Sequence, residues 1–476
     1  MRRLAPILLF LSLLTVYGMT LAPGLTWANR GADGGDLITA AATGGVPHPT
    51  GYPVYLLLAR LFQLLPIGSL AFRSNLLSAL AAAFASLWVY GLTMRVSDNY
   101  WAGLVAAYAF GLAPLPWSQA VITEVYALHA FFVALILFLS INPPCADAKK
   151  SDLAIGLTFG LALGNHATTI LLLPLILASV LTRRGSRLKL DLRALFHRTL
   201  WMGAGLSLYL LLPLRAAAHP PVNWGNPVTL ENFGWLVTGR LYQDELLALT
   251  LSSLWEQIQS TAALLIGQFG IVGLTVSLLG LILFFRPSRL YASLLWTALA
   301  FSAFAIGFAT QDSYVHLIPA ILCFAIWLGL GVDGIMRLIS SHTKKLAWTA
   351  GLAALVYLAA LAAFHWPQVD ASRDTRAEQF GGLVMAQMPA DTLVFAKGDE
   401  AVFSLWYFHF ALRQRPDLVI VASDLLPFDW YRGTLQATYP SLILQDALFP
   451  KALIASNSQR PACTVEYDDR VVIQCP

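Results

Sequence analysis

Long runs of apolar residues without a single charged side chain recur along this sequence. A helix that crosses a bilayer needs about 20 mostly apolar residues, and most of these runs reach that length. They cover residues 4–26, 74–94, 101–123, 125–146, 153–182, 199–214, 257–285, 290–311, 313–332 and 346–369. The pattern predicts a mainly α-helical, polytopic membrane protein.

The first run has a second interpretation. Met1-Arg2-Arg3 precedes the apolar residues 4–26, as basic residues precede the core of a cleaved signal peptide. The run is long, however, and no small-residue cleavage motif closes it. We therefore expect a retained span.

Basic residues between the runs predict the topology, because short cytoplasmic loops collect Lys and Arg. The clusters are Arg2/Arg3, Arg95, Lys149/Lys150, residues 183–198, Arg286/Arg289 and Arg337/Lys344/Lys345. If all of them are cytoplasmic, residues 153–182 must form a hairpin that turns near residues 164–166. The pattern then gives eleven spans, with a cytoplasmic N-terminus and a C-terminus on the opposite side.

Composition supports the membrane assignment. Only 12% of the 476 residues are charged and 57% are hydrophobic, whereas soluble domains average about 25% charged residues. The net charge is +4, and no basic block interleaves with aromatic residues, which excludes a nucleic-acid surface. The cysteines (Cys145, Cys323, Cys463 and Cys475) lack metal-ligand spacing.

The polar segments divide the chain into two predicted domains. Residues 1–365 form the membrane domain, whose first outer loop, 27–73, includes a short surface helix within 50–66. Residues 366–476 are richer in charge and contain a strand–helix–strand pattern that predicts a small extracytoplasmic α/β domain. There, Cys463 and Cys475 are either a disulfide, as an oxidising compartment permits, or two free thiols.

Asp33 and Asp36 are the first candidates for chemistry. They lie just beyond the first run, flanked by glycines that allow the backbone to bend or to approach a ligand. A carboxylate there could remove a proton from an acceptor hydroxyl, or the pair could hold a divalent cation. The structural alternative is a pair of helix caps in a solvated loop.

Other polar residues fall on the same predicted side, and ionisable groups at membrane depth are usually functional. Each has a structural alternative: His48 in a turn, His166 in an interhelical hydrogen bond, Asp312 as an N-cap, and Asn223-Trp224 in a turn. Glu124 and Gln311 belong to the same set. Together these residues predict one polar cavity facing away from the cytoplasm. The full list of candidate substrate contacts also includes Tyr52, Tyr126 and Arg240.

Several motifs in this order resemble the membrane family catalogued as domain of unknown function 2723, which includes a vertebrate endoplasmic-reticulum protein O-mannosyltransferase. They are ADGGDLITAA, HPTGYPVYLLLARLF, NLLSAL, WSQAVITEVYALHAFF, GLALGNHATTILLLP, PLRAAAHPPVNWGNP, QDSYV and RPDLVIVASDLL, within residues 27–425. The chain departs from the family pattern at Asp36, where Glu is usual, and at Thr50, where Pro is usual.

The resemblance implies a multi-spanning glycosyltransferase of the architecture called GT-C, which uses a sugar linked to a polyprenyl phosphate. It implies that Asp33, with Asp36 beside it, is the catalytic acid of the first outer loop. We expect His48, His166 or Arg240 to hold the departing phosphate. Sugar hydroxyls would then contact Glu124, Tyr126 and Asp312.

Two other classes of function are consistent with part of the pattern. A transporter or flippase of a lipid-linked or small polar substrate would also place polar groups inside a helical bundle. A non-catalytic scaffold would use the α/β domain to bind a partner. For the enzyme we expect a protein or glycan acceptor and, since the sequence lacks a retention signal, a bacterial inner membrane.

Overall fold

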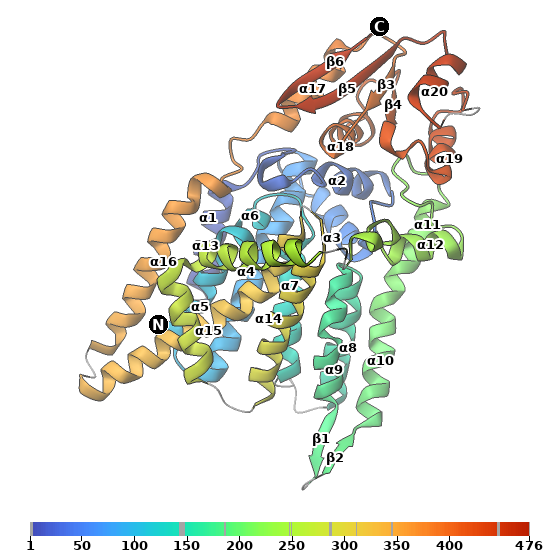
Figure 1. The fold of residues 1–476 in the computed structure, drawn as a ribbon. Coiled ribbons are helices and arrows are strands. Elements are labelled where there is room, and N and C mark those ends of the chain that lie inside the picture. Colours follow the sequence, from blue (N-terminus) through green and yellow to red (C-terminus); the bar gives the residue numbers. More distant parts are fainter. Residues whose placement is uncertain are drawn as a thin grey trace.

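The computed structural model describes residues 3–141, 148–184, 187–246, 248, 250–284, 288–310, 312–343, 346–444 and 448–475. It is mainly helical, with a small mixed sheet near the C-terminus (Figure 1). Arg2, Cys145, Arg286, Gln311, Lys344 and Lys345, which enter the sequence-based predictions, lie outside the described residues.

Five helical segments in the described part of the chain are long and apolar enough to cross a membrane: Leu70–Ser97, Ser252–Leu283, Arg289–Gly307, Ser313–Ser341 and Ala347–Val369. Shorter apolar helices occupy Ala5–Thr20, Tyr126–Ser140 and Ala167–Ser179. The membrane-protein prediction is confirmed in this form. The full count of eleven spans stays a prediction, because several expected spans are short or broken.

The N-terminal helices pack against one another as one part of the bundle. They are α1 (Ala5–Thr20), α4 (Leu70–Ser97), α5 (Tyr100–Gly111), α6 (Pro114–Ala120) and α7 (Tyr126–Ile141). The expected span 101–123 is divided into α5 and α6, because Pro114 cannot continue the hydrogen bonding of α5. Helix α1 packs against the other helices with one face, where the Tyr17 hydroxyl donates to the Gly111 carbonyl at 2.7 Å, while Ile7, Leu8 and Leu11 on its other face are exposed.

The predicted turn near residues 164–166 is confirmed. Helix α8 (Ala148–Leu163) ends there, and the chain continues through η2 (Ala167–Leu172) and α9 (Leu173–Ser179). Arg198 Nε donates to Asp152 near the start of α8 at 2.8 Å, and the same guanidinium donates to Ser179 at the end of α9. The two ends of the segment therefore meet at Arg198, as a hairpin requires.

The expected span 199–214 is not a single helix. A β-hairpin (β1, Leu181–Arg184; β2, Arg187–Leu190) leads into α10 (Leu192–Leu206), which is followed by η3 (Ser207–Leu210) and α11 (Leu211–Ala216). Helix α10 lies against α8 at an edge of the bundle (Figure 1). Glycines allow this approach: a Cβ on Gly156 would lie 2.4 Å from the Arg198 carbonyl oxygen.

The polar stretch after α11 contains α12 (Leu230–Val237) and η4 (Arg240–Glu245). The bundle then continues with α13 (Leu251–Leu283), α14 (Arg289–Gly307), η5 (Ser313–Leu317), α15 (Ile318–His342) and α16 (Ala347–Val369). Gly270, with φ 65° and ψ 169°, bends α13, so the expected straight span 257–285 is a kinked helix.

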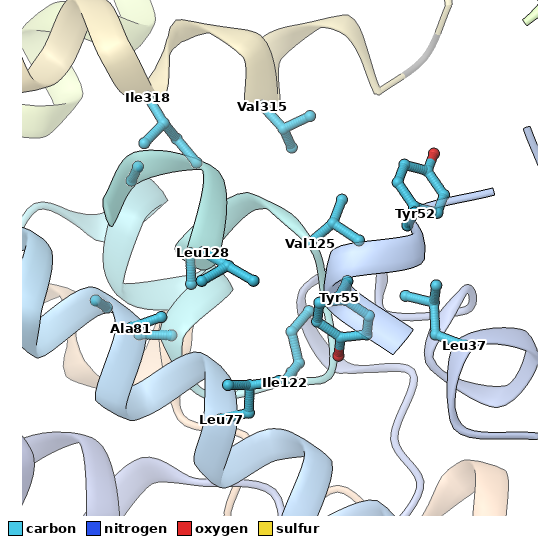
Figure 2. Close-up of a cluster of buried hydrophobic side chains, with 14 of the residues drawn as sticks. Leu37, Tyr52, Tyr55, Leu77, Ala81, Ile122, Val125, Leu128, Val315 and Ile318 are labelled. Carbon is cyan, nitrogen blue, oxygen red and sulfur yellow. The ribbon is translucent and has the colours of Figure 1, made fainter. Parts of the chain in front are cut away.

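The predicted first outer loop, 27–73, is largely ordered as helix. It holds η1 (Ala28–Arg30), α2 (Gly34–Thr43) and α3 (Pro53–Gln63), the last being the helix expected within 50–66. Buried side chains of α2, α3, α4 and α7 form one apolar layer, among them Leu37, Tyr55, Leu77 and Leu128 (Figure 2). This apolar layer supports the polar residues described below.

The predicted strand–helix–strand pattern is present in the C-terminal part. Its elements are α17 (Arg376–Gln387), β3 (Leu393–Ala396), α18 (Asp399–Trp406), the π-helical turn η7 (Tyr407–Ala411), β4 (Val419–Ala422), η8 (Ser423–Leu425), α19 (Asp429–Thr438), α20 (Pro450–Ser456), β5 (Ala462–Asp468) and β6 (Arg470–Gln474). The sheet order is β4-β3-β5-β6, with only β6 antiparallel. Cys463 and Cys475 form a disulfide across the β5–β6 hairpin, which decides between the two alternatives.

The C-terminal part packs on the segment that carries Asp33 and Asp36 (Figure 1). Helix α18 approaches α2 so closely that a Cβ on Gly35 would lie 2.4 Å from the Phe403 carbonyl oxygen. Asp374, after α16, accepts hydrogen bonds from Thr26 Oγ1 and from the backbone N–H groups of Trp27 and Ala28 at 2.6–2.9 Å. The glycine at position 35 thus serves helix packing, not the approach of a ligand.

We expect Gly35→Ala to destabilise the protein. The added Cβ would meet backbone atoms that cannot rotate away, and overpacking of this kind costs about 1–3 kcal/mol of unfolding free energy. The apparent melting temperature of purified protein in detergent should fall. The matched control is Gly34→Ala, whose Cβ would lie 3.4 Å from Thr123 and which should melt like wild type. Equal melting of both variants would contradict the packing argument.

Candidate functional site

The carboxylate of Asp36 is fully buried and accepts three hydrogen bonds. Its Oδ2 receives the backbone N–H of His48 at 2.9 Å and lies 2.7 Å from His48 Nδ1. Its Oδ1 receives the indole Nε1–H of Trp224 at 3.2 Å. Asp36 therefore fixes the His48 ring and joins α2 to two loops that are distant from it in sequence.

The other nitrogen of the His48 ring faces Asp33. His48 Nε2 lies 3.7 Å from Asp33 Oδ2, so the three side chains form a row in the order Asp36, His48, Asp33. Asp33 occupies the N-cap position of α2 but accepts no capping hydrogen bond. Its side chain is 38% exposed, whereas that of Asp36 is not exposed at all. The cap alternative for Asp33 is thus not realised.

The two carboxylates favour a charged imidazole between them. Burial lowers the pKa of His48, but the charge of Asp33 and the hydrogen bond to Asp36 outweigh this and raise that pKa from 6.5 to about 9. Loss of solvation raises the pKa of Asp33; the positive charge of His48 opposes this rise, and the charge of Asp36 reinforces it. A raised pKa suits a carboxylate that must accept a proton.

The loop that carries His48 is held from both sides. The Val46 N–H donates to the Val222 carbonyl at 2.9 Å, and the Trp224 N–H donates to the Val46 carbonyl at 3.1 Å. Gly51 has a φ of 84°, in the left-handed region that favours glycine, and a Cβ there would lie 2.7 Å from Leu212. The loop conformation therefore depends on the residues near Trp224 and on α11.

A cavity of about 380 Å³ opens beside this row. Six predicted site residues line it: Asp33, His48, Tyr52, Tyr126, His166 and Asp312. The wall also includes apolar residues (Ile170, Leu171, Leu246, Phe304 and Phe308) and polar ones (Thr168, Tyr242, Gln243, His316 and Asp399). These six residues come from distant segments and share the wall of one cavity, while their roles stay a prediction.

The remaining candidates that the structure describes do not line the cavity. Asp36 and Trp224 lie behind His48, and Asn223 lies in the turn next to Trp224, where its Nδ2 donates to Asn226 at 3.2 Å. Arg240 is exposed on η4, next to Gly239, which does line the cavity. Gln311 lies outside the described residues.

Glu124 is buried between α6 and α7, with 5% exposure. Its Oε2 accepts the Val125 N–H at 3.2 Å. Burial raises the pKa of this carboxyl, and the charge of Asp33 adds to the effect. Glu124 therefore lies behind the wall and does not line the cavity.

Arg30 forms an ion pair with Asp312 at 3.3 Å, and both side chains are more than half exposed. The same guanidinium lies 5.1 Å from the centre of the Tyr314 ring. Asp312 makes no N-capping hydrogen bond, so that alternative is not realised. The pair brings a cation from η1 to the rim of the cavity, which the sequence analysis did not anticipate.

Several residues of the site were missed in the sequence. His129 and His316 join His166 in a cluster of rings, and Asp399 reaches the cavity from the first turn of α18. Burial raises the pKa of Asp399 to about 6, and the negative charge of Asp33 adds to it. His129 and His316 could have been found because each is a histidine inside an apolar run. No sequence signal pointed to Asp399, because it is distant in sequence from the other site residues and lies in another predicted domain.

The predicted cation site between Asp33 and Asp36 is not preformed. Both Asp36 oxygens already accept hydrogen bonds, so a metal ion bound there would have to displace His48 or Trp224. In the described residues, no group of three His, Cys, Asp or Glu side chains has an arrangement that could hold a metal ion.

Solved structures share the fold over nearly the whole chain. ArnT from Cupriavidus metallidurans in the apo state superposes with a TM-score of 0.60 at 14% identity, covering 97% of this chain and 93% of that chain. An Archaeoglobus fulgidus oligosaccharyltransferase superposes with a TM-score of 0.56 at 13% identity, covering 97% of this chain and 69% of that chain. The chain is therefore a polytopic membrane protein with a GT-C-like fold.

Sequence comparison identifies relatives more specifically. A family model described as the Protein O-mannosyl-transferase TMEM260 N-terminal domain matches residues 33–189. The mouse Protein O-mannosyl-transferase TMEM260 is 29% identical over 468 residues, which cover 91% of this chain and 64% of the relative. The Dictyostelium discoideum protein of the same name is 23% identical, and the match covers 96% of this chain and 60% of that relative.

These matches confirm the resemblance to protein O-mannosyl-transferases. The chain spans less than two thirds of the length of either curated relative. Both relatives are eukaryotic and so give no support to a bacterial origin, which stays a prediction, as does assignment to domain of unknown function 2723.

We expect protonated His48 to stabilise the fold in a pH-dependent way. Because its pKa rises from 6.5 to about 9 on folding, the stabilisation is fully present below about pH 6.5 and is lost as the pH rises through about 9. Wild type should therefore melt at a higher temperature than His48→Gln near pH 6, and the difference should shrink towards pH 10.

Asp36→Asn provides the control for this experiment. Without the carboxylate beside Nδ1, the stabilisation by His48 should be lost at a lower pH than in the protein that keeps Asp36. If the melting difference between wild type and the His48→Gln variant stays constant across this pH range, the charged row is not present.

Proposed function

We propose that this protein is a membrane glycosyltransferase that moves a sugar from a polyprenyl-phosphate donor to an acceptor hydroxyl. Mannose is the first candidate, because both curated relatives are named protein O-mannosyl-transferases. A polyprenyl donor is supported by the ArnT structure bound to undecaprenyl phosphate, which has the same fold with a TM-score of 0.59.

The row Asp36–His48–Asp33 at the cavity is the observation on which this proposal depends. It places a partly exposed carboxylate beside an imidazole that the buried Asp36 orients. The cavity wall is apolar at Ile170, Leu171, Phe304 and Phe308 and polar near the row. Such a cavity matches a lipid-linked sugar, which combines an apolar chain with a polar headgroup.

In the proposed reaction, Asp33 removes the proton from the acceptor hydroxyl. The hydroxyl oxygen then attacks the anomeric carbon, and the bond between that carbon and the phosphate oxygen breaks. The polyprenyl phosphate leaves with the electron pair of this bond, so its negative charge increases as the bond lengthens. A fixed positive or hydrogen-bond-donating group near that oxygen stabilises the transition state.

His48 is the best-placed group for the departing phosphate. Asp36 accepts from Nδ1, and the Nε2–H of the charged ring lies on the side of Asp33 and the cavity, 3.7 Å from Asp33 Oδ2, which is too long for a hydrogen bond. His166 also lines the cavity, and its Nδ1 lies 2.7 Å from Thr168 Oγ1. Arg240 and Arg30 at the rim supply further positive charge. Asp36 acts here as a positioning residue, because it does not reach the cavity.

The remaining assignments complete the proposal. Tyr52, Tyr126 and Asp312 contact the sugar, whereas Glu124 acts from behind the wall. The acceptor is a protein or glycan hydroxyl; an oligosaccharyltransferase of the same fold, with a TM-score of 0.52, has been solved with a tethered acceptor peptide. The proposal also includes eleven membrane spans and two domains, residues 1–365 and 366–476. In this arrangement the cavity opens away from the cytoplasm.

The test is transfer of radiolabelled mannose from polyprenyl-phosphate mannose in proteoliposomes. We expect Asp33→Asn to reduce transfer by about 10²–10⁴-fold, the usual contribution of a general base, while the apparent melting temperature stays close to that of wild type. Asp417→Asn, a change at a surface carboxylate paired with Arg415, serves as the control and should transfer normally.

Full transfer by Asp33→Asn would reject this residue as the base and leave the enzyme assignment intact. A wild-type protein that moves the intact lipid-linked sugar across the bilayer, without transferring the sugar, would instead favour the flippase alternative.

A further inference from the structure

His316 differs from the other histidines around the cavity. It is 7% exposed and lines the cavity from η5. Its Nδ1 is buried and has no hydrogen-bond partner among the residues that the structure describes. His316 is therefore a wall residue of the cavity with one ring nitrogen that no described residue satisfies.

The neighbouring histidines all have protein partners. His166 Nδ1 lies 2.7 Å from Thr168 Oγ1, and the ring nitrogens of His129 lie 3.3 and 3.4 Å from Thr168 and Thr169. His48 is bonded to Asp36. A buried polar ring without a partner is costly, so an unbonded His316 in a cavity wall indicates a ligand that supplies the missing partner.

The surroundings of His316 indicate the chemical class of that ligand. Its ring meets Phe304 edge-on, with centroids 5.0 Å apart, and Tyr126 edge-on at 5.8 Å; Phe308 lies at 5.7 Å. Aromatic faces pack against the C–H groups of a sugar ring, whereas hydroxyl and imidazole groups bond its hydroxyls. Among the described residues, the rings packed against His316 are those of Tyr126, His166, Phe304 and Phe308. None of these is a Lys or Arg side chain, so this part of the wall offers a phosphate anion no permanently charged cation.

We propose that His316 is a hydrogen-bonding contact of the transferred sugar, in a subsite whose wall includes Tyr126, Phe304 and Phe308. The inference rests on the proposed glycosyltransferase function and deepens it. The phosphate of the donor then lies toward His48, and the sugar toward η5 and α14. Because one hydrogen bond to a hydroxyl depends on where that hydroxyl points, His316 helps to select the sugar.

The experiment compares two ligands that differ only in the sugar. Purified wild type, His316→Phe and His316→Gln are titrated with polyprenyl phosphate and with polyprenyl-phosphate mannose, and binding is followed by intrinsic fluorescence. We expect His316→Phe to weaken binding of the mannose-bearing lipid by about threefold to tenfold and to leave binding of the bare lipid phosphate unchanged. His316→Gln, which keeps a polar side chain at this position, should restore part of the loss.

Two further variants make the result independent of folding. His365→Phe changes a buried histidine of α16 that is bonded to Gln368 at 3.0 Å and does not line the cavity, so it should bind both lipids like wild type. Tyr126→Phe removes only a hydroxyl of the same subsite. Tyr126→Phe should therefore also weaken binding of the mannose-bearing lipid and leave binding of the bare lipid phosphate unchanged. This test works even if His316→Phe fails to fold.

The outcomes separate this inference from the proposed function. If wild type prefers the mannose-bearing lipid and His316→Phe keeps the full preference, His316 is not the sugar contact. If His316→Phe weakens binding of both lipids equally, the histidine contacts the phosphate, and its assignment to the sugar is wrong. If wild type binds neither lipid, the proposed donor itself is rejected, and the subsite with it.

Discussion

The buried carboxylate of Asp36 is the constraint on which the polar end of this protein depends. A carboxylate without water must find its hydrogen bonds in the protein, and Asp36 finds them on His48 and Trp224. These partners belong to loops that a pair of backbone hydrogen bonds between Val46 and residues 222–224 already holds together. Satisfying one charge therefore fixes three segments relative to one another.

The same constraint connects the C-terminal part to the site. The Trp224 indole that donates to Asp36 packs against Phe403 and Trp406 of α18 and against Trp430 of α19, with ring centroids 5.6–6.3 Å apart. Helix α18 can lie this close only because residue 35 is glycine. A displacement of the α/β part would thus move Trp224 and, through Asp36, the orientation of His48.

Burial explains how two similar carboxylates take different roles. Asp36 is enclosed and saturated with hydrogen bonds, so it orients a neighbour. Asp33 is partly exposed, has a raised pKa and keeps an oxygen toward the cavity, so in the proposed reaction it exchanges a proton. His48 lies between them and transmits the position of one to the other. The Glu-to-Asp departure from the family pattern at position 36 therefore falls on a positioning group rather than on the proposed base.

The sequence by itself determined the features that depend on local composition. Charge-free runs predicted α4, α14 and α16, and short apolar segments predicted the strands β3 and β4, because hydrophobicity along a short segment dictates burial wherever that segment lies. The basic residues on both sides of residues 153–182 predicted the break at residues 164–166. It also placed Asp33, His48, His166 and Asp312 on one side of the bundle. Only the tertiary structure decided what depends on contacts between distant residues: the division of 101–123, the bend at Gly270, the enclosure of Asp36 by a tryptophan 188 positions away, and the unbonded ring of His316. Hydrogen-bond partners and solvent access are properties of the packed protein, so no local pattern could show which acid was buried and which histidine was left for a ligand.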